Sequence, residues 1–352
     1  MKIIFTGGGT GGHVIPNLAI IGEVRKLAGK AQLFYIGSKD GIEKQLVQKE
    51  GVKFYAIQTG KLRRYFSLQN MVDAVRVPIG VAQAIYRLLK IKPDVVFSKG
   101  GFVSVPVAIA AGILRIPLVI HESDLTPGLA TKITARFANK ICLSFPTTHS
   151  GDKIQITGNP MRKNGDAKKG KAFLKFNNKK PIVLITGGSS GADFLNFLVE
   201  KSIPVLEKKV NIVWLTGKNK KTSGKQFADC RIFEYLDAEY LDVLAASDLV
   251  ISRSGANAIF EIAAAVKPSI LIPLPAKSSR GDQIENARFF EKNGAAVVLS
   301  QEKIKPQAFA KLIIQMVSDV KRLQKVSKAA EKLASKDSAK KIAKIILEES
   351  RK

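Results

Sequence analysis

The sequence contains few residues that could crosslink the chain or bind a metal ion. Among its 352 residues are three histidines and two cysteines, Cys142 and Cys230. Two cysteines cannot build a disulfide framework, and their positions match no metal-binding spacing. This usage is typical of a protein from a reducing compartment, so we expect each cysteine to be a small residue of the core.

Long apolar segments are also absent. The longest stretch without a charged residue or a histidine, 100–114, has 15 residues and includes Pro106, whereas a helix that spans a bilayer needs about 20. The first apolar run is short and leads directly into glycines, which is unlike a secretory signal. We therefore expect neither a signal peptide nor a membrane-spanning helix.

Acidic residues are few relative to basic ones. The 57 lysines and arginines outnumber 29 aspartates and glutamates, which leaves a net charge of +28. Such a charge favours an anionic partner, namely nucleic acid, an anionic membrane or a phosphorylated substrate, although a lysine-rich solvated surface would explain it equally well. No nucleic acid is expected, because the basic residues are interspersed and no RNP-type aromatic motif or zinc-ligand spacing occurs.

The sequence does contain β-type apolar runs that alternate with helical patterns, in a chain long enough for two domains. This alternation predicts an α/β fold with parallel sheets. In the first half, strands are expected at 2–5, 32–36, 94–97, 118–120, 140–143 and 154–157. In the second half, they are expected after 181 and at 211–215, 232–234, 249–251, 269–272 and 296–299.

The two halves begin alike, each with a strand, a glycine turn and a helix, which predicts two Rossmann-like domains facing across a cleft. Segment 162–171 is polar and lacks apolar periodicity, so we interpret it as the linker between domains 1–161 and 172–335. The lysine-rich tail has an amphipathic helical pattern typical of a packing helix. The final helix, 336–352, could pack back on the first domain.

The first glycine loop, 7–12, fits the G-x-G-x-x-G pattern of dinucleotide-binding enzymes. That pattern also requires an acid at the end of the second strand to bind the adenosine ribose. The sequence has Gly37 at that place, and Asp40 comes only later. A nicotinamide enzyme is therefore disfavoured, and no cofactor is expected.

Comparable glycine loops follow strands at 98–104, 186–192 and 252–258. Glycines let backbone N–H groups approach an anion, and the helix that follows adds partial positive charge. One such loop could be a structural turn, but four predict a site for phosphates or sugars. The glycines expected to approach them are Gly100, Gly101, Gly187 and Gly188.

The fourth loop begins a helix near Ser254 or Gly255 whose amides suit a diphosphate. Glu261 lies nearly two turns into this helix, where its carboxylate could accept both hydroxyls of a ribose. No D-x-D pair stands near any glycine loop, so no sugar-nucleotide metal site is predicted. The charge of a leaving diphosphate would then be met by helix N-termini and by cations such as Arg162.

Seven motifs, ordered from residue 7 to about 287, carry a resemblance that covers nearly the whole chain. They are GGGTGGHVIP, SKGGFVSVP, HESDLTPGL, TGNPMR, GGSSGA, SRSGANAIFE and RGDQIENA. The sequence resembles the MurG family of GT-B glycosyltransferases. That resemblance implies a peripheral enzyme on the cytoplasmic face of the cell membrane, which transfers N-acetylglucosamine from UDP-N-acetylglucosamine to undecaprenyl-diphosphate-muramyl-pentapeptide (lipid I). The transfer inverts the anomeric carbon and forms lipid II for peptidoglycan.

The resemblance also implies roles for individual residues. The N-terminal half would bind the lipid-linked acceptor, and the C-terminal half would bind the nucleotide. His13 matches the suspected base, with Glu122 as the alternative, and Glu261 matches the ribose-binding glutamate. Leu236 would contact the uracil through its backbone. The remaining matches to donor-binding positions are Thr10, Gly11, Gly12, Asp124, Arg162, Ser189 and Gln283.

Two departures from the family bear on these roles. Many relatives have asparagine at the place of Asp124, and an ionised acid cannot donate the hydrogen bonds of an amide. Ala258 stands where the family often has a hydroxyl residue. A glycosyltransferase acting on diacylglycerol is the nearest rival, since it shares the glycine loops; the HESD and TGNP motifs favour the muramyl acceptor by resemblance.

A membrane-docking patch is predicted at Arg63, Arg64, Tyr65 and Phe66, where cations adjoin apolar anchors. Each cation near an anionic leaflet contributes about 1 kcal/mol. The helical pattern that follows, 72–89, fits either membrane docking or an ordinary amphipathic helix that covers the sheet.

Overall fold

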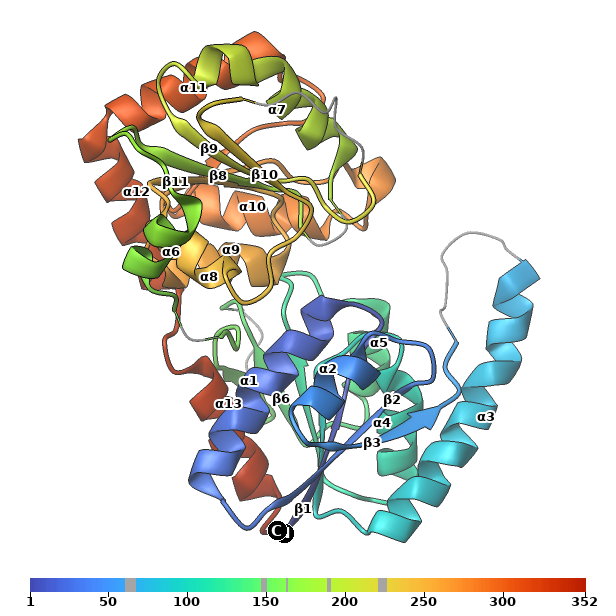
Figure 1. The fold of residues 1–352 in the computed structure, drawn as a ribbon. Coiled ribbons are helices and arrows are strands. Elements are labelled where there is room, and N and C mark those ends of the chain that lie inside the picture. The colour runs from blue at the N-terminus through green and yellow to red at the C-terminus, as the bar shows by residue number, and fades with distance from the viewer. Residues whose placement is uncertain (61–67, 147–150, 163, 189–190, 221–226) are drawn as a thin grey trace. The chain divides into compact units, whose positions relative to one another are not determined.

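The fold consists of two α/β units in a computed structural model that describes residues 1–352 except 61–67, 147–150, 163, 189–190 and 221–226. Unit 1 comprises Met1–Arg162 together with Asp337–Lys352, and unit 2 comprises Lys163–Lys336. Figure 1 traces the chain through both units.

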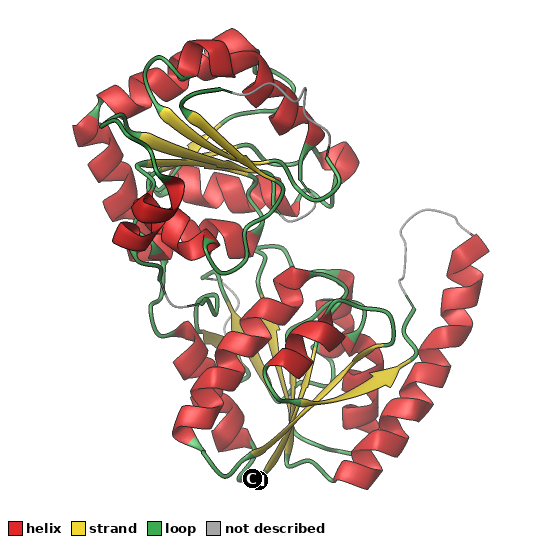
Figure 2. Ribbon diagram, in the orientation of Figure 1, coloured by secondary structure: helices red, strands yellow, loops and turns green. Residues whose placement is uncertain are grey.

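Unit 1 is built on a parallel sheet whose order, among the described residues, is β3-β2-β1-β4-β5-β6-β7. Its central strands are continuous apolar runs that are buried throughout, because helices cover both faces of the sheet (Figure 2). The strands are β1 (Lys2–Thr6), β2 (Gln32–Ser38), β3 (Lys53–Ile57), β4 (Val95–Ser98), β5 (Leu118–Glu122), β6 (Lys140–Leu143) and β7 (Ile154–Ile156). The helices are α1 (Gly11–Leu27), α2 (Glu43–Lys49), α3 (Leu68–Ile91), α4 (Ser104–Ile113), α5 (Leu129–Thr134) and α13 (Ser338–Glu349).

Unit 2 repeats this plan with the strand order β10-β9-β8-β11-β12-β13 in its described part. Its strands are β8 (Ile182–Thr186), β9 (Asn211–Leu215), β10 (Cys230–Phe233), β11 (Leu249–Ser252), β12 (Ser269–Leu271) and β13 (Val297–Val298). Its helices are α6 (Ala167–Leu174), α7 (Asp193–Leu206), α8 (Tyr240–Ala246), α9 (Ala256–Ala264), α10 (Asp282–Lys292), α11 (Pro306–Ser318) and α12 (Val320–Leu333), with a short 3-10 turn at Ala276–Ser278.

The predicted α/β class with two Rossmann-like units is confirmed. In each sheet the first strand of the unit pairs with two neighbours, so that Ile4 lies opposite both Phe34 and Val96. Each predicted strand corresponds to an observed one. Strand β3 was not predicted, because its sequence is short and only partly buried.

The expected linker, 162–171, is too long. Its second part begins α6, because Asp166 caps the helix by accepting a hydrogen bond from the Lys168 backbone N–H at 2.8 Å. Leu174, at the end of the helix, is buried in the core of unit 2. The polar composition therefore marks one turn of a capped helix as well as the connection.

The amphipathic tail from residue 320 divides into two helices that belong to different units. Helix α12 lies in unit 2, whereas α13 lies in unit 1 and packs against α1. Ile342 and Ile346 of α13 are fully buried in the core cluster beneath α1. The last helix of the chain is therefore an integral part of unit 1.

Candidate active site

Two glycine loops meet where the strand order of unit 1 reverses, between β1 and β4. The first loop, 7–12, follows β1, and the second, 99–103, follows β4. Gly101 has a φ of +81°, and a methyl group on it would lie 2.5 Å from the Gly8 carbonyl oxygen. Neither the conformation nor the space permits a larger residue. Ligands of open α/β sheets bind at such a reversal of strand order.

His13, the predicted base, lies in the first turn of α1, which begins at Gly11. Its backbone N–H donates to the Thr10 carbonyl oxygen at 3.1 Å. The half-buried imidazole packs against the second glycine loop: a methyl group on Gly101 would lie 2.9 Å from Cδ2, and one on Gly100 would lie 3.9 Å from the ring. The structure thus brings His13 together with the predicted glycines of the second loop.

The first glycine loop is held from beneath by buried polar side chains. Glu43 of α2 is fully buried, and its carboxylate accepts hydrogen bonds from Ser38 N–H at 2.9 Å and from Gly9 N–H at 3.4 Å. The Tyr35 hydroxyl donates to the Gly7 carbonyl oxygen at 2.6 Å, and burial raises the pKa of this tyrosine. An acid therefore does reach the end of β2, but it comes from α2 and binds the protein's own backbone.

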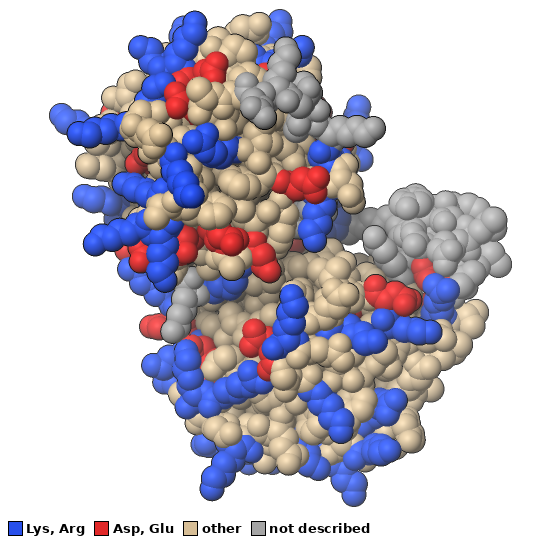
Figure 3. Space-filling view, in the orientation of Figure 1, with Lys and Arg blue, Asp and Glu red and all other residues tan. Residues whose placement is uncertain are grey.

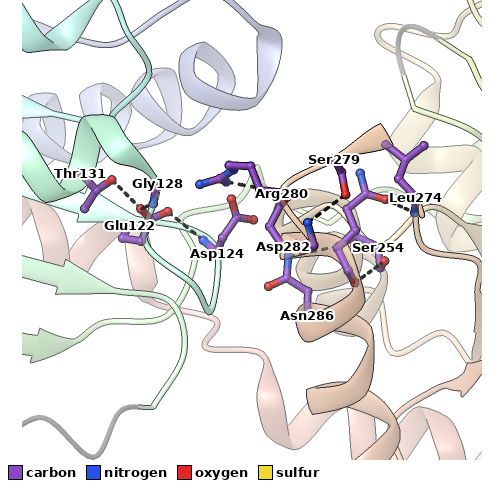
Figure 4. A network of polar contacts seen from close by, with 12 residues as sticks. Glu122, Asp124, Gly128, Thr131, Ser254, Leu274, Ser279, Arg280, Asp282 and Asn286 are labelled. Atoms are coloured by element: carbon purple, nitrogen blue, oxygen red, sulfur yellow. Dashed lines mark hydrogen bonds and ion pairs between the residues drawn. The ribbon is translucent and has the colours of Figure 1, made fainter. Parts of the chain in front are cut away.

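Glu122 ends β5 and organises the loop that follows it (Figure 4). Its buried carboxylate accepts hydrogen bonds from Asp124 N–H at 3.0 Å, from Gly128 N–H at 3.2 Å and from the Thr131 hydroxyl. Each of these donors belongs to the loop or to α5. This geometry gives Glu122 a structural task, and it favours His13 over Glu122 as the group that meets a substrate.

Lys99 is a site residue that the sequence analysis missed. It follows β4 directly, is only 1% exposed, and donates from Nζ to the Ser123 hydroxyl. Burial lowers the pKa of Lys99 to about 8, against the opposing influence of Glu122 and Asp124. Its place between a buried strand and two glycines was the signal available in the sequence, but its burial depends on the neighbouring strands.

Unit 2 has a second reversal of strand order, between β8 and β11. Gly187 and Gly188 follow β8, and Gly188 is exposed with a φ of +84°. After β11, α9 begins with Gly255 as an N-cap that provides no side-chain hydrogen bond. The Ser254 hydroxyl donates to the Gln283 carbonyl oxygen at 2.8 Å, which ties the start of α9 to α10 (Figure 4).

Charged and amide side chains surround the start of α9. Arg253 is buried and donates to the carbonyl oxygens of Ile272 and Pro273 at 2.9 and 3.1 Å. The Gln283 side chain accepts from Leu274 N–H at 3.1 Å, so its carbonyl group is used within the protein. Glu261 is half-buried on α9, beyond its first turn, as predicted.

The remaining predicted residues differ in their accessibility. The Leu236 side chain is buried in the core of unit 2, so only its backbone can contact a ligand. Gly12 lies in the first turn of α1, and Arg162 is the half-buried last residue of the first segment of unit 1. Ser189 lies outside the described residues, as do the predicted docking residues Arg63, Arg64, Tyr65 and Phe66.

The described part of the chain lacks both a cluster of metal-binding side chains and a membrane-spanning helix. It contains no group of three or more His, Cys, Asp and Glu side chains that could hold a metal ion. It also contains no helix that is long and apolar enough to cross a membrane.

Two family models together match most of the chain. Residues 3–143 match the glycosyltransferase family 28 N-terminal domain, and residues 182–343 match the C-terminal domain of the same family.

Curated relatives are similar over most of their length. The chain is 48% identical to a Clostridium tetani protein over 316 residues, which cover 88% of this chain and 87% of the relative. That relative is named UDP-N-acetylglucosamine--N-acetylmuramyl-(pentapeptide) pyrophosphoryl-undecaprenol N-acetylglucosamine transferase. A Bacillus cereus protein with the same name and the number 2 is also 48% identical, over 90% of this chain and 91% of its own.

Solved structures agree in fold. Acinetobacter baumannii MurG superposes with a TM-score of 0.78 at 23% identity and covers 99% of both chains. A UDP-GlcNAc 2-epimerase from Neisseria meningitidis, solved with bound UDP-GlcNAc, superposes with a TM-score of 0.69 at 14% identity and covers 99% of this chain and 100% of its own. At these identities the likeness concerns the fold.

Replacing Glu122 with glutamine tests its structural task. Glutamine has one acceptor oxygen in place of two, so a partly buried backbone N–H or the buried Thr131 hydroxyl would lose its partner. We expect the variant to lose about 1–3 kcal/mol of unfolding free energy in urea titrations. Glu50→Gln, an exposed change in the same unit, is the control, and equal stability of the two variants would contradict this assignment.

Proposed function

Because the chain belongs to glycosyltransferase family 28, we propose that it transfers N-acetylglucosamine from UDP-N-acetylglucosamine to lipid I and so forms lipid II for peptidoglycan. The observation that carries this proposal is the 48% identity, over 88% of the chain, to a relative named for that reaction. The glycine-lined reversal of strand order in each unit supports it, since an enzyme with two large substrates needs two binding surfaces.

Unit 2 is proposed to bind the donor. The first-turn amides of α9 suit the diphosphate, because Gly255 offers no side chain that would cap them. Glu261 would accept hydrogen bonds from the ribose, and the Leu236 backbone would contact the uracil. Arg162 and Ser189 are proposed as further donor contacts.

Unit 1 is proposed to bind the acceptor and to supply the base. The muramyl 4-hydroxyl would attack C1 of the donor sugar while its proton passes to the imidazole of His13. The new C1–O bond forms as the bond from C1 to the β-phosphate oxygen breaks, and UDP leaves with the bonding electrons. Attack opposite to the leaving group inverts C1, and the positive ends of helices stabilise the departing charge.

Transfer of label from radioactive UDP-N-acetylglucosamine tests the acceptor. We expect label to enter lipid I and to remain absent from diacylglycerol. The rival lipid glycosyltransferase predicts the reverse, so incorporation into diacylglycerol alone would refute the proposed acceptor.

Replacing Glu261 with alanine removes the proposed ribose acceptor. We expect UDP binding, measured by calorimetry, to weaken about tenfold or more, since hydrogen bonds to charged groups contribute about 1.5–3 kcal/mol. Glu302→Ala, an exposed change in unit 2, is the control. Unchanged UDP affinity in the Glu261 variant would show that the ribose is bound elsewhere.

Replacing His13 with alanine removes the proposed base. We expect kcat to fall by about 10²- to 10⁴-fold, the usual contribution of general base catalysis, while UDP affinity stays near its original value. Near-normal kcat would assign the base to another residue. Lower activity accompanied by a lower melting temperature would instead indicate that His13 mainly stabilises the start of α1.

The surface of α3 supports docking on an anionic membrane. Val75, Ile79, Tyr86 and Leu89 are 62%, 41%, 58% and 56% exposed, and their spacing places them on one side of the helix. The opposite side, with Ala84 and Leu88, is buried in unit 1. One side of α3 therefore packs on the core, and the other is exposed to solvent.

Charge complements this apolar stripe. Arg76 and Lys90 lie beside it and are exposed, and Lys and Arg outnumber Asp and Glu over the visible face of the molecule (Figure 3). Cations next to exposed apolar side chains suit an anionic bilayer surface. We therefore extend the proposed docking patch from residues 63–66 to the exposed side of α3.

The double change Tyr86→Glu and Leu89→Glu tests the docking surface. It places two carboxylates on the exposed side of α3 without touching the core. We expect loss of sedimentation with anionic vesicles at low salt, and nearly unchanged transfer to a short-chain, detergent-soluble acceptor. Phe197→Glu with Val205→Glu, on exposed positions of α7, is the control. If both double variants bind vesicles normally, the membrane surface lies elsewhere.

A further inference from the structure

We propose that Lys99 is a positioning residue of the acceptor side, whose buried ammonium compensates the carboxylates of Glu122 and Asp124 and holds the loop that carries them. This proposal rests on the proposed function, in which unit 1 binds the acceptor. It assigns a task to a buried charge that the transfer mechanism itself does not use.

Burying Lys99 is unfavourable for the stability of unit 1. The side chain is among the largest that are fully buried, and burial is the main reason that the pKa of its ammonium falls to about 8. An apolar side chain of similar length would avoid this desolvation. Residues that destabilise a fold are typical of functional sites, where activity and stability conflict.

The ammonium is anchored in a polar network that joins four adjacent strand ends. Lys99 follows β4 and donates to the Ser123 hydroxyl, which follows β5. Ser123 donates to Asn159 Oδ1 at 3.3 Å, and Ser144, which follows β6, donates to the same oxygen at 3.2 Å. Asn159 comes after β7. The network therefore fixes the backbone at residues 122–124 relative to the loop that contacts His13.

The titratable groups that face Lys99 come from β5, from the loop after it and from α1. Glu122 and Asp124 both raise the pKa of Lys99, so they stabilise its charged form. Burial, and secondarily the charge of Lys99, hold the pKa of His121 well below its usual value, so His121 is neutral. On the α1 side, His13 lies against Gly100 and Gly101, the two residues after Lys99. Lys99, Glu122 and Asp124 thus lie at the same edge of the sheet.

The negative charge of Asp124 explains why a buried cation is needed at Lys99. An asparagine at this position would be neutral and would need no compensating charge. With an aspartate there, loss of Lys99 would remove a positive charge that interacts favourably with the carboxylates of both Glu122 and Asp124. Removing the acid should therefore relieve the effect of removing the lysine.

A mutant cycle tests this dependence with Lys99→Met, Asp124→Asn and the double variant, and with exposed Lys49→Met as the control. At pH 7 we expect Lys99→Met to lower kcat/KM for the lipid acceptor about tenfold, which corresponds to a coupling of about 1.4 kcal/mol. UDP affinity should be unchanged, because the nucleotide contacts are proposed in unit 2. The double variant should regain the activity of Asp124→Asn alone.

The pH dependence supplies a readout that a purely structural lysine would not give. Wild-type kcat/KM should fall as the pH rises through about 8, where Lys99 loses its proton, and Lys99→Met should lack this step. The pKa of Lys99 is lower in the folded than in the unfolded chain, so the unfolded chain binds more protons between about 8 and 10.5. The contribution of Lys99 to stability therefore rises across that window while activity falls.

Three results would overturn the proposal: wild-type acceptor kinetics in Lys99→Met, a lower melting temperature with equal loss of UDP binding, or a double variant no more active than Lys99→Met. The assignment of the acceptor is tested separately. If wild-type protein fails to glycosylate lipid I, the proposed function is wrong, whereas failure of the cycle in an enzyme that does so refutes only the task of Lys99.

Discussion

The close contact of two glycine loops at the carboxyl ends of β1 and β4 determines the geometry of unit 1. Because a methyl group on Gly101 would lie 2.5 Å from the Gly8 carbonyl oxygen, a side chain at this position would displace the first loop. The first turn of α1, with His13, and the turn that leads to α4 are both fixed by this contact. The position of the proposed base therefore depends on backbone atoms that take no part in the proposed reaction.

The sequence alone predicted those parts of the fold whose signals are local. Central strands such as β1, β4 and β11 are apolar runs with a glycine within three residues of their end, and their positions could be inferred directly from the sequence. Strand β3 has a short and partly exposed sequence, so pairing with β2 determines it. The beginning of α6 looked like a linker because its lysines face solvent, whereas the burial of Leu174 depends on the rest of unit 2.

The candidate site was predictable to the same degree. The glycine loops and Glu261 could be inferred from residue type and spacing, whereas His13 was assigned through the family resemblance. The structure places the glycine loops and His13 at the reversals of strand order, and Glu261 on α9 beyond its first turn. The roles of Glu43 and Lys99 could not be predicted in this way. Each is a common charged residue, and its burial depends on the packing of the folded sheet and its helices. Glu122 was recognised as important, but its bonds to the loop after β5 could not be inferred from sequence.

The two units have the same strand order around the reversal, but the charged side chains near the N–H groups of their glycine loops differ. In unit 1, Gly9 N–H donates to the buried carboxylate of Glu43, so the first loop already binds an internal anion. In unit 2, α9 begins at a glycine without a side-chain cap, and the nearby buried charge is the cation Arg253. An added diphosphate would be repelled by the first arrangement and attracted by the second. This difference supports the proposal that unit 2 binds the nucleotide, and it suits the first loop of unit 1 to an uncharged part of a substrate, such as a sugar hydroxyl.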